Sequence, residues 1–198
     1  MYKKQMLFQK IMCMLALIAA ALVFVYSLGM STDLYDALAR TILYPDYDLE
    51  QTSVAGSRVY YDMFAFNKTF TKVSIGLILV AVLLFITNTN VRRKYYSGNY
   101  ISTGLFTVSS IGVAVWAIPQ IMDYKSQYQQ KVDFEALKAF SEDWGTLYIG
   151  PEDTFWFDIS YAVFGFLILT AVLLVINMIL KILVMKAEQN AIGKGRSV

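Results

Sequence analysis

The chain has 198 residues, of which 57% are hydrophobic and only 16% are charged. Soluble domains carry about 25% charged residues, so this composition favours a membrane protein over a soluble globular domain. The sequence contains one cysteine and no histidine, which excludes an internal disulfide, a dithiol redox site and imidazole chemistry. We therefore expect no cofactor, no metal site and no nucleic-acid partner.

Four uncharged apolar stretches are long enough to cross a bilayer as helices. A hydrocarbon core about 30 Å thick takes about 20 helical residues, and a helix pairs its backbone groups within itself. We predict an all-α membrane protein with four transmembrane helices, arranged as two hairpins with a small extracytoplasmic cap. The predicted spans are residues 11–30, 73–91, 101–122 and 159–180.

The first span follows a basic N-terminus and could also be read as a cleavable signal peptide. The sequence Ser27-Leu28-Gly29 has the shape of a cleavage site. However, the apolar stretch exceeds the roughly 7–15 residues typical of a signal peptide. We therefore predict a retained signal anchor, and cleavage would leave three helices.

The first long loop, residues 31–72, contains one predicted amphipathic helix. The stretch STDLYDALARTIL places Leu34, Leu38 and Ile42 on one face. Pro45 ends this pattern, because the residue before a proline avoids the helical region.

Arg92, Arg93 and Lys94 form a predicted topology anchor between the second and third spans. The N-terminus, the loop 92–100 and the tail 181–198 hold ten of the seventeen cations and one of the fifteen acids. Lys and Arg stay on the cytoplasmic side, so we expect both termini and this loop inside a plasma membrane.

The two long loops, residues 31–72 and 123–158, are then outside, with fourteen acids and seven cations. The second long loop contains another predicted helix, VDFEALKAFSEDWG. Asp133 is its expected N-cap and Gly145 its terminator, while Phe134, Leu137 and Phe140 share one face. Both loops are rich in aromatic residues, whereas disordered segments are poor in them, so we expect a folded cap containing short amphipathic helices.

Two groups of residues are candidates for functional contacts. Polar residues within the spans are expected to form hydrogen bonds between helices, with a solute path as the alternative. Aromatic residues of the cap are expected to contact a partner or ligand, with an interfacial aromatic belt as the alternative. The polar group is Thr107, Ser109, Ser110 and Asn177, and the aromatic group is Tyr60, Tyr61, Trp144, Tyr148 and Trp156.

The sequence contains no nucleotide motif and no recognisable pair of nucleophile and base. The leading hypothesis is a non-enzymatic accessory or assembly subunit of a larger membrane complex, such as a transporter. Its partners would be the lipid bilayer and another membrane protein or further copies of itself. The alternative is a homo-oligomeric channel or small-solute transporter.

Overall fold

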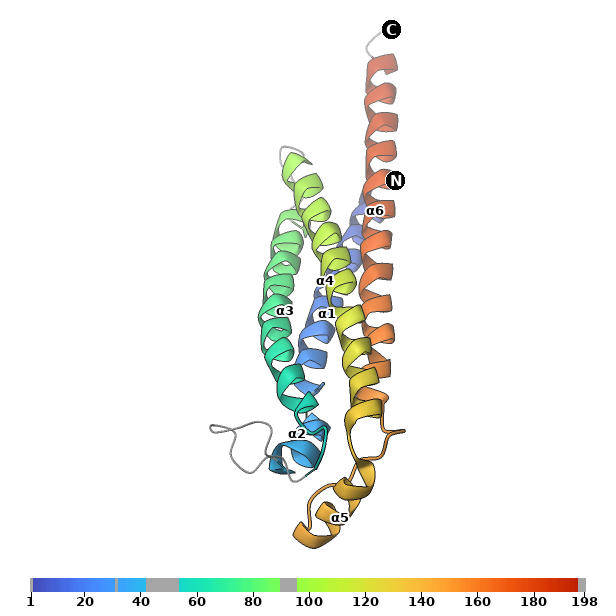
Figure 1. The fold of residues 1–198 in the computed structure, drawn as a ribbon. Helices are drawn as coiled ribbons and strands as arrows, with labels where there is room; N and C mark the ends of the chain where they lie inside the picture. The colour runs from blue at the N-terminus through green and yellow to red at the C-terminus, as the bar shows by residue number, and fades with distance from the viewer. Residues whose placement is uncertain (1, 31, 42–53, 90–95, 196–198) are drawn as a thin grey trace. The chain divides into compact units, whose positions relative to one another are not determined.

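A computed structural model describes residues 2–30, 32–41, 54–89 and 96–195. Within these ranges the chain is helical and contains no strand. Four helices are long and apolar enough to cross a membrane, which confirms the prediction of an all-α, multi-pass membrane protein. They are α1 (Tyr2–Gly29), α3 (Val59–Thr89), α4 (Tyr96–Lys131) and α6 (Phe155–Gly195) (Figure 1).

These helices are longer than the spans that the hydropathy pattern predicts. Helix α3 has 31 residues and α6 has 41, which correspond to about 46 and 60 Å at about 1.5 Å per residue. A hydrocarbon core is only about 30 Å thick, so each helix is long enough to extend beyond it by several turns. The predicted tail 181–198 therefore begins inside a continuous helix, because α6 passes through Lys181 without a break.

The two short amphipathic helices are present. Helix α2 (Thr32–Leu38) continues into a 3₁₀ turn, Ala39–Thr41. It buries Leu34 and Leu38, while Ile42 and Pro45 lie outside the described residues.

Helix α5 (Phe134–Trp144) begins and ends where the sequence predicts. Asp133 caps it, because Asp133 Oδ1 accepts a hydrogen bond from the Ala136 amide at 3.0 Å. Gly145 ends it with a φ of 61°, a left-handed conformation that glycine adopts without strain.

The chain divides into two compact units. Unit 1 comprises residues 1–22, 75–114 and 164–198, and unit 2 comprises residues 23–74 and 115–163. Their sequences differ sharply in charge: unit 1 has ten cations and one acid, whereas unit 2 has seven cations and fourteen acids. The anchor residues Arg92, Arg93 and Lys94 belong to unit 1 but lie outside the described residues.

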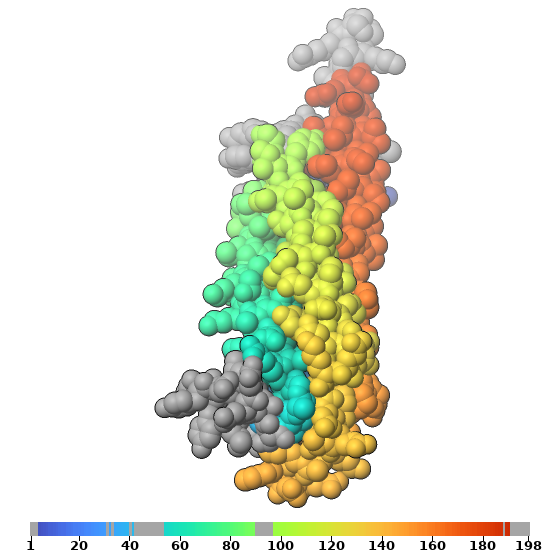
Figure 2. All heavy atoms as spheres, in the orientation of Figure 1, coloured from blue at the N-terminus to red at the C-terminus, as the bar shows by residue number. Residues whose placement is uncertain are grey.

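Unit 1 buries alanine, aliphatic and a few aromatic residues, and it leaves many other large apolar residues exposed. Ala16 and Leu84 are fully buried, whereas Leu79 and Val108 are 65% and 69% exposed. Atoms of α4, coloured yellow-green to yellow, lie on the visible surface in the space-filling view (Figure 2). Large apolar side chains exposed along uncharged helices are typical of a lipid-facing surface.

Unit 2 has a core of stacked aromatic rings. The Phe66 ring lies 5.8 Å from Phe70, 5.3 Å from Trp116 and 5.6 Å from Tyr124, measured between centroids. The Tyr124 hydroxyl also donates to the Asp62 carbonyl oxygen at 3.1 Å. These contacts join the beginning of α3 to the end of α4.

A close backbone crossing also joins these two helices. The Asp133 amide donates to the Ala55 carbonyl oxygen at 3.0 Å, and Gly56 adopts a φ of 81° beside it. A Cβ atom at Gly56 would lie 1.9 Å from the Lys131 carbonyl oxygen, so only glycine fits here.

Candidate functional sites

Unit 1 contains a group of buried polar residues that joins three of its helices. Gln9 of α1 donates through Nε2 to the Asn88 carbonyl oxygen and Oδ1 on α3, each at 2.9 Å. Asn88 in turn donates through Nδ2 to Ser102 Oγ on α4 at 2.9 Å. Thr87 Oγ1 donates to the same Ser102 oxygen at 2.8 Å.

The fourth helix completes this group. The Asn99 side-chain oxygen and nitrogen are assigned from the groups that they face. In this orientation Lys181 Nζ on α6 donates to Asn99 Oδ1 at 2.7 Å. Asn99 Nδ2 then donates to the Thr87 carbonyl oxygen at 2.6 Å. One turn before Lys181, Asn177 Oδ1 accepts from Gln5 Nε2 on α1 at 3.2 Å.

These bonds connect α1 to α3, α3 to α4, α4 to α6 and α6 back to α1. We call the eight residues the polar belt: Gln5, Gln9, Thr87, Asn88, Asn99, Ser102, Asn177 and Lys181. Hydrogen bonds between helices in a membrane contribute about 0.6 kcal/mol each on average, so a closed set fixes the relative register of the four segments.

Lys181 differs from its sequence prediction. The sequence places it at the start of a basic tail outside the fourth span, but its side chain is only 4% exposed. It lies in one of the four helices that are apolar enough to cross a membrane. Burying an ammonium group is costly unless hydrogen bonds offset the lost hydration, and Asn99 provides such an acceptor.

The predicted intramembrane polar residues have different surroundings. Asn177 belongs to the polar belt, whereas Ser110 is fully buried and Ser109 is half-buried. Thr107 lines an apolar groove of about 180 Å³ between α4 and α6. Within the described part of the chain, Thr107 Oγ1 and Ser110 Oγ have no hydrogen-bond partner, so the structure brings only Asn177 to an expected contact between helices.

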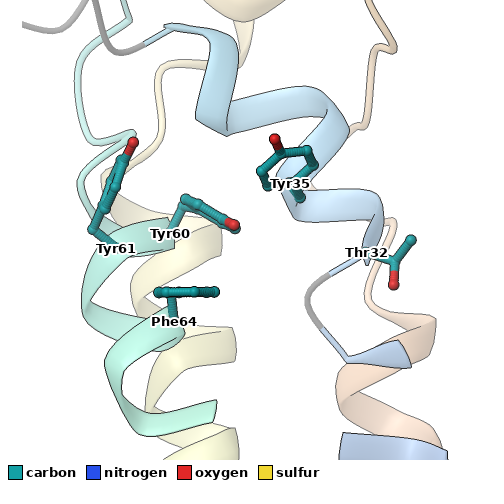
Figure 3. Close-up of a pocket in the computed structure, with 5 residues that line it drawn as sticks. All are labelled: Thr32, Tyr35, Tyr60, Tyr61 and Phe64. Carbon is teal, nitrogen blue, oxygen red and sulfur yellow. The ribbon is translucent and has the colours of Figure 1, made fainter. Parts of the chain in front are cut away.

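Unit 2 contains a cavity of about 370 Å³ that we call the tyrosine pocket. Helix α2 contributes Thr32 and Tyr35, and the first two turns of α3 contribute Tyr60, Tyr61 and Phe64. Tyr60 and Phe64 extend from α3 toward α2 in the close-up view (Figure 3). The pocket contains two of the predicted recognition residues, Tyr60 and Tyr61.

A second cavity, of about 320 Å³, lies at the connection between α5 and α6, and we call it the connector groove. Its lining includes two further predicted residues, Tyr148 and Trp156. The whole lining consists of Leu34, Leu147, Tyr148, Ile149, Asp153, Phe155, Trp156 and Phe157.

Helix α4 holds the connection that forms this groove. The buried Tyr128 hydroxyl donates to the Gly150 carbonyl oxygen at 2.6 Å, and Gln129 Nε2 donates to the Pro151 carbonyl oxygen at 3.0 Å. The Trp156 ring packs on Gly29 of α1, where a Cβ atom would lie 2.8 Å from the ring. Trp156 is therefore partly a packing residue.

The fifth predicted residue, Trp144, lines neither cavity. Its side chain is 72% exposed and stacks on Phe140, with ring centroids 6.0 Å apart. The structure therefore divides the five predicted recognition residues between two cavities and one exposed ring. Helix α2 contributes to both cavities, through Tyr35 on one side and Leu34 on the other.

The sequence analysis did not identify the polar belt, apart from Asn177. A signal was present, because polar residues recur three or four positions apart near one end of three of the four apolar stretches. The pairs are Gln5 with Gln9, Asn99 with Ser102 and Asn177 with Lys181, together with the adjacent Thr87 and Asn88. This spacing places each pair on one face of its helix.

These features define an all-helical, multi-pass membrane protein with a polar belt in one unit and two aromatic-lined cavities in the other. Among the described residues, no three His, Cys, Asp or Glu side chains are grouped so as to hold a metal ion. No protein-family model, curated protein or solved structure matches the chain.

Proposed function

We propose that this protein is a non-enzymatic accessory or assembly subunit of a larger membrane complex, such as a transporter. Recognition would occur at unit 2, acting as an extracytoplasmic cap on four spans arranged as two hairpins. The observation that carries the proposal is the exposure of large apolar residues around the connector groove. Leu147 is 48% exposed, Tyr148 40% and Phe155 64%.

Exposed aromatic residues beside a groove are typical of protein interfaces. Aromatic side chains are enriched at the centres of interfaces, where they fill pockets on the partner. The hydrogen bonds from Tyr128 and Gln129 hold the groove in place before any partner binds. Such preorganisation reduces the ordering cost of association.

The charge distribution supports a plasma-membrane orientation with both termini in the cytoplasm. Unit 1 carries ten of the seventeen cations, and cytoplasmic segments are enriched in Lys and Arg. The anchor Arg92, Arg93 and Lys94 would then be cytoplasmic as well. The fourteen acids of unit 2 would face the outside.

A homo-oligomeric channel receives less support. Asn177 is bonded to Gln5 inside unit 1, and Ser110 is fully buried. The channel alternative expects Thr107, Ser110 and Asn177 to line a path between protomers, and the last two do not face outward. Thr107, on the apolar groove between α4 and α6, is the remaining candidate.

Affinity purification in a mild detergent, followed by native mass determination and mass spectrometry, tests the accessory-subunit proposal. We expect a stoichiometric foreign membrane protein. Tyr148→Ala combined with Phe155→Ala should abolish its recovery, whereas the control Tyr161→Ala, another exposed aromatic at 56%, should not. A clean monomer would refute the proposal, and a clean homo-oligomer would favour the channel alternative.

A further inference from the structure

The tyrosine pocket has aromatic walls, and most of its lining surface is apolar. Four of its five lining residues are aromatic, and its side-chain polar atoms are the hydroxyl oxygens of Thr32, Tyr35, Tyr60 and Tyr61. Tyr35 is 55% exposed and Phe64 is 47% exposed, so the pocket is open to a ligand. Such a lining disfavours ligands that need many hydrogen bonds, because their polar groups would lose hydration without replacement.

The rings are grouped around Tyr60. Its ring centroid lies 5.9 Å from that of Tyr35, 5.3 Å from Tyr61 and 6.1 Å from Phe64. The Tyr61 ring stands nearly perpendicular to Tyr60, at 80°, and the Tyr35 ring is tilted by 60°. A cation seated against this group can face more than one ring within the roughly 6 Å over which cation–π attraction acts.

The charge of unit 2 favours a cation over an anion. Its sequence has fourteen acids against seven cations. One of these acids, Asp36, directly follows the pocket residue Tyr35, whereas Asp62, which follows Tyr61, pairs with Arg58 at 3.9 Å. A field of one sign raises the local concentration of ligands of the opposite sign.

We propose that the tyrosine pocket binds a quaternary ammonium group, such as the trimethylammonium group of choline. This cation has no N–H donors, so it needs no hydrogen-bond acceptor and can lie against the apolar faces of the rings. Its charge is attracted by the faces of the aromatic rings.

The trimethylammonium group could belong to a free solute or to a lipid headgroup. Phe64 precedes the predicted span 73–91 by nine residues, or about 13 Å along a helix. The headgroup layer is only about 5–8 Å thick on each side, which favours the free solute. The inference does not depend on the accessory-subunit proposal, since it concerns a different cavity and a different class of ligand.

The test is isothermal titration of the full chain in a sugar-headed detergent, which has no ammonium group. Choline and tetramethylammonium should bind, whereas the neutral isostere of choline, in which carbon replaces nitrogen, should not. Phe64→Leu keeps apolar volume but removes the ring, so it should weaken binding about fivefold. Phe64→Tyr keeps the ring and should preserve binding, and Phe155→Leu is the matched control outside the pocket.

Repeating the titration in nanodiscs distinguishes the two sources of the group. Weaker choline binding in phosphatidylcholine than in phosphatidylglycerol nanodiscs would show that the lipid headgroup occupies the pocket. Equal binding in both would identify a free solute. Equal affinity for the neutral isostere, an unchanged affinity in Phe64→Leu, or no choline binding in detergent and in phosphatidylglycerol would overturn the proposal. Tryptophan fluorescence checks that each variant remains folded.

Discussion

The two units are built from the same four long helices but are held together by different interactions. In unit 1, polar side chains of every long helix are bonded in the polar belt. In unit 2, the same helices pack through aromatic rings, and a backbone crossing at Gly56 brings α3 against α4. Hydrogen bonds between side chains are directional and specify how the helices align along their axes. Aromatic packing is less directional, and in unit 2 it is accompanied by two cavities.

The sequence supplies a separate reporter for each unit. All three tryptophans, Trp116, Trp144 and Trp156, lie in unit 2, and the single cysteine, Cys13, lies fully buried in unit 1. Tryptophan fluorescence therefore follows unit 2, while thiol labelling follows unit 1. SDS titration in mixed micelles can measure both transitions on one sample.

The largest effect is expected for Phe66→Ala in the aromatic core of unit 2. Phe66 is 7% exposed and contacts three other rings, so its removal should cost about 3–5 kcal/mol. The tryptophan transition should move to much lower SDS. Phe155→Ala, which removes a 64% exposed ring, is the control and should change little. An equal shift in Cys13 labelling would mean that the two units unfold as one.

Gly56→Ala should have the next largest effect. A Cβ atom there would collide with the Lys131 carbonyl oxygen at a positive φ, and the strain should cost about 3 kcal/mol. The tryptophan transition is again the measurement. Gly76→Ala is the matched control, because nothing lies within 4 Å of its Cβ position. Similar transitions in the two variants would show that the backbone crossing is unimportant.

Lys181→Met should weaken unit 1 selectively. It leaves Asn99 Oδ1 without its donor, and a buried acceptor that loses its partner costs about 1–3 kcal/mol. We expect Cys13 to become accessible to the labelling reagent at a lower SDS fraction than in the wild type, while the tryptophan transition stays unchanged. Lys186→Met removes an exposed lysine from the same helix and should leave both transitions in place. If the Lys181 variant is as stable as the wild type, the hydrogen bond from Lys181 to Asn99 contributes nothing to the stability of unit 1.

The smallest effect is expected for the ion pair between Lys125 and Asp158 in unit 2. Their side chains are 24% and 48% exposed, and pairs of this kind contribute about 0.5 kcal/mol. Lys125→Gln should shift the tryptophan transition slightly at low salt. Because salt screens exposed charges, the difference from wild type should vanish at about 1 M salt. A salt-independent loss would instead implicate packing by the lysine stem.

The sequence predicted the helices better than the contacts between them. Spans follow from hydropathy alone, and Asp133 and Gly145 mark the ends of α5 because their conformational preferences are local. The polar belt depends on how four helices rotate toward one another, which no single segment encodes. Lys181 shows the difficulty, since a lysine after an apolar stretch has the same local pattern whether it is solvated or buried.

The candidate cavities were predictable only in part. Tyr60 and Tyr61 were expected to take part in recognition because aromatic residues are frequent in binding sites. These two residues share a pocket with Tyr35 only because α2 packs beside the beginning of α3. The segment that connects the two helices includes residues outside the described ranges. Trp156 was expected at the surface, but the absence of a side chain at Gly29 gives it a place to pack.

The polar belt also imposes an order on biogenesis. Its last two members, Asn177 and Lys181, are on α6, which the ribosome makes after the other three long helices. Until α6 is made, Gln5 and Asn99 lack the partners that Asn177 and Lys181 provide. The belt can therefore close only after α6 has been made, so a chain that stops before α6 keeps three helices without the bonds that complete the set.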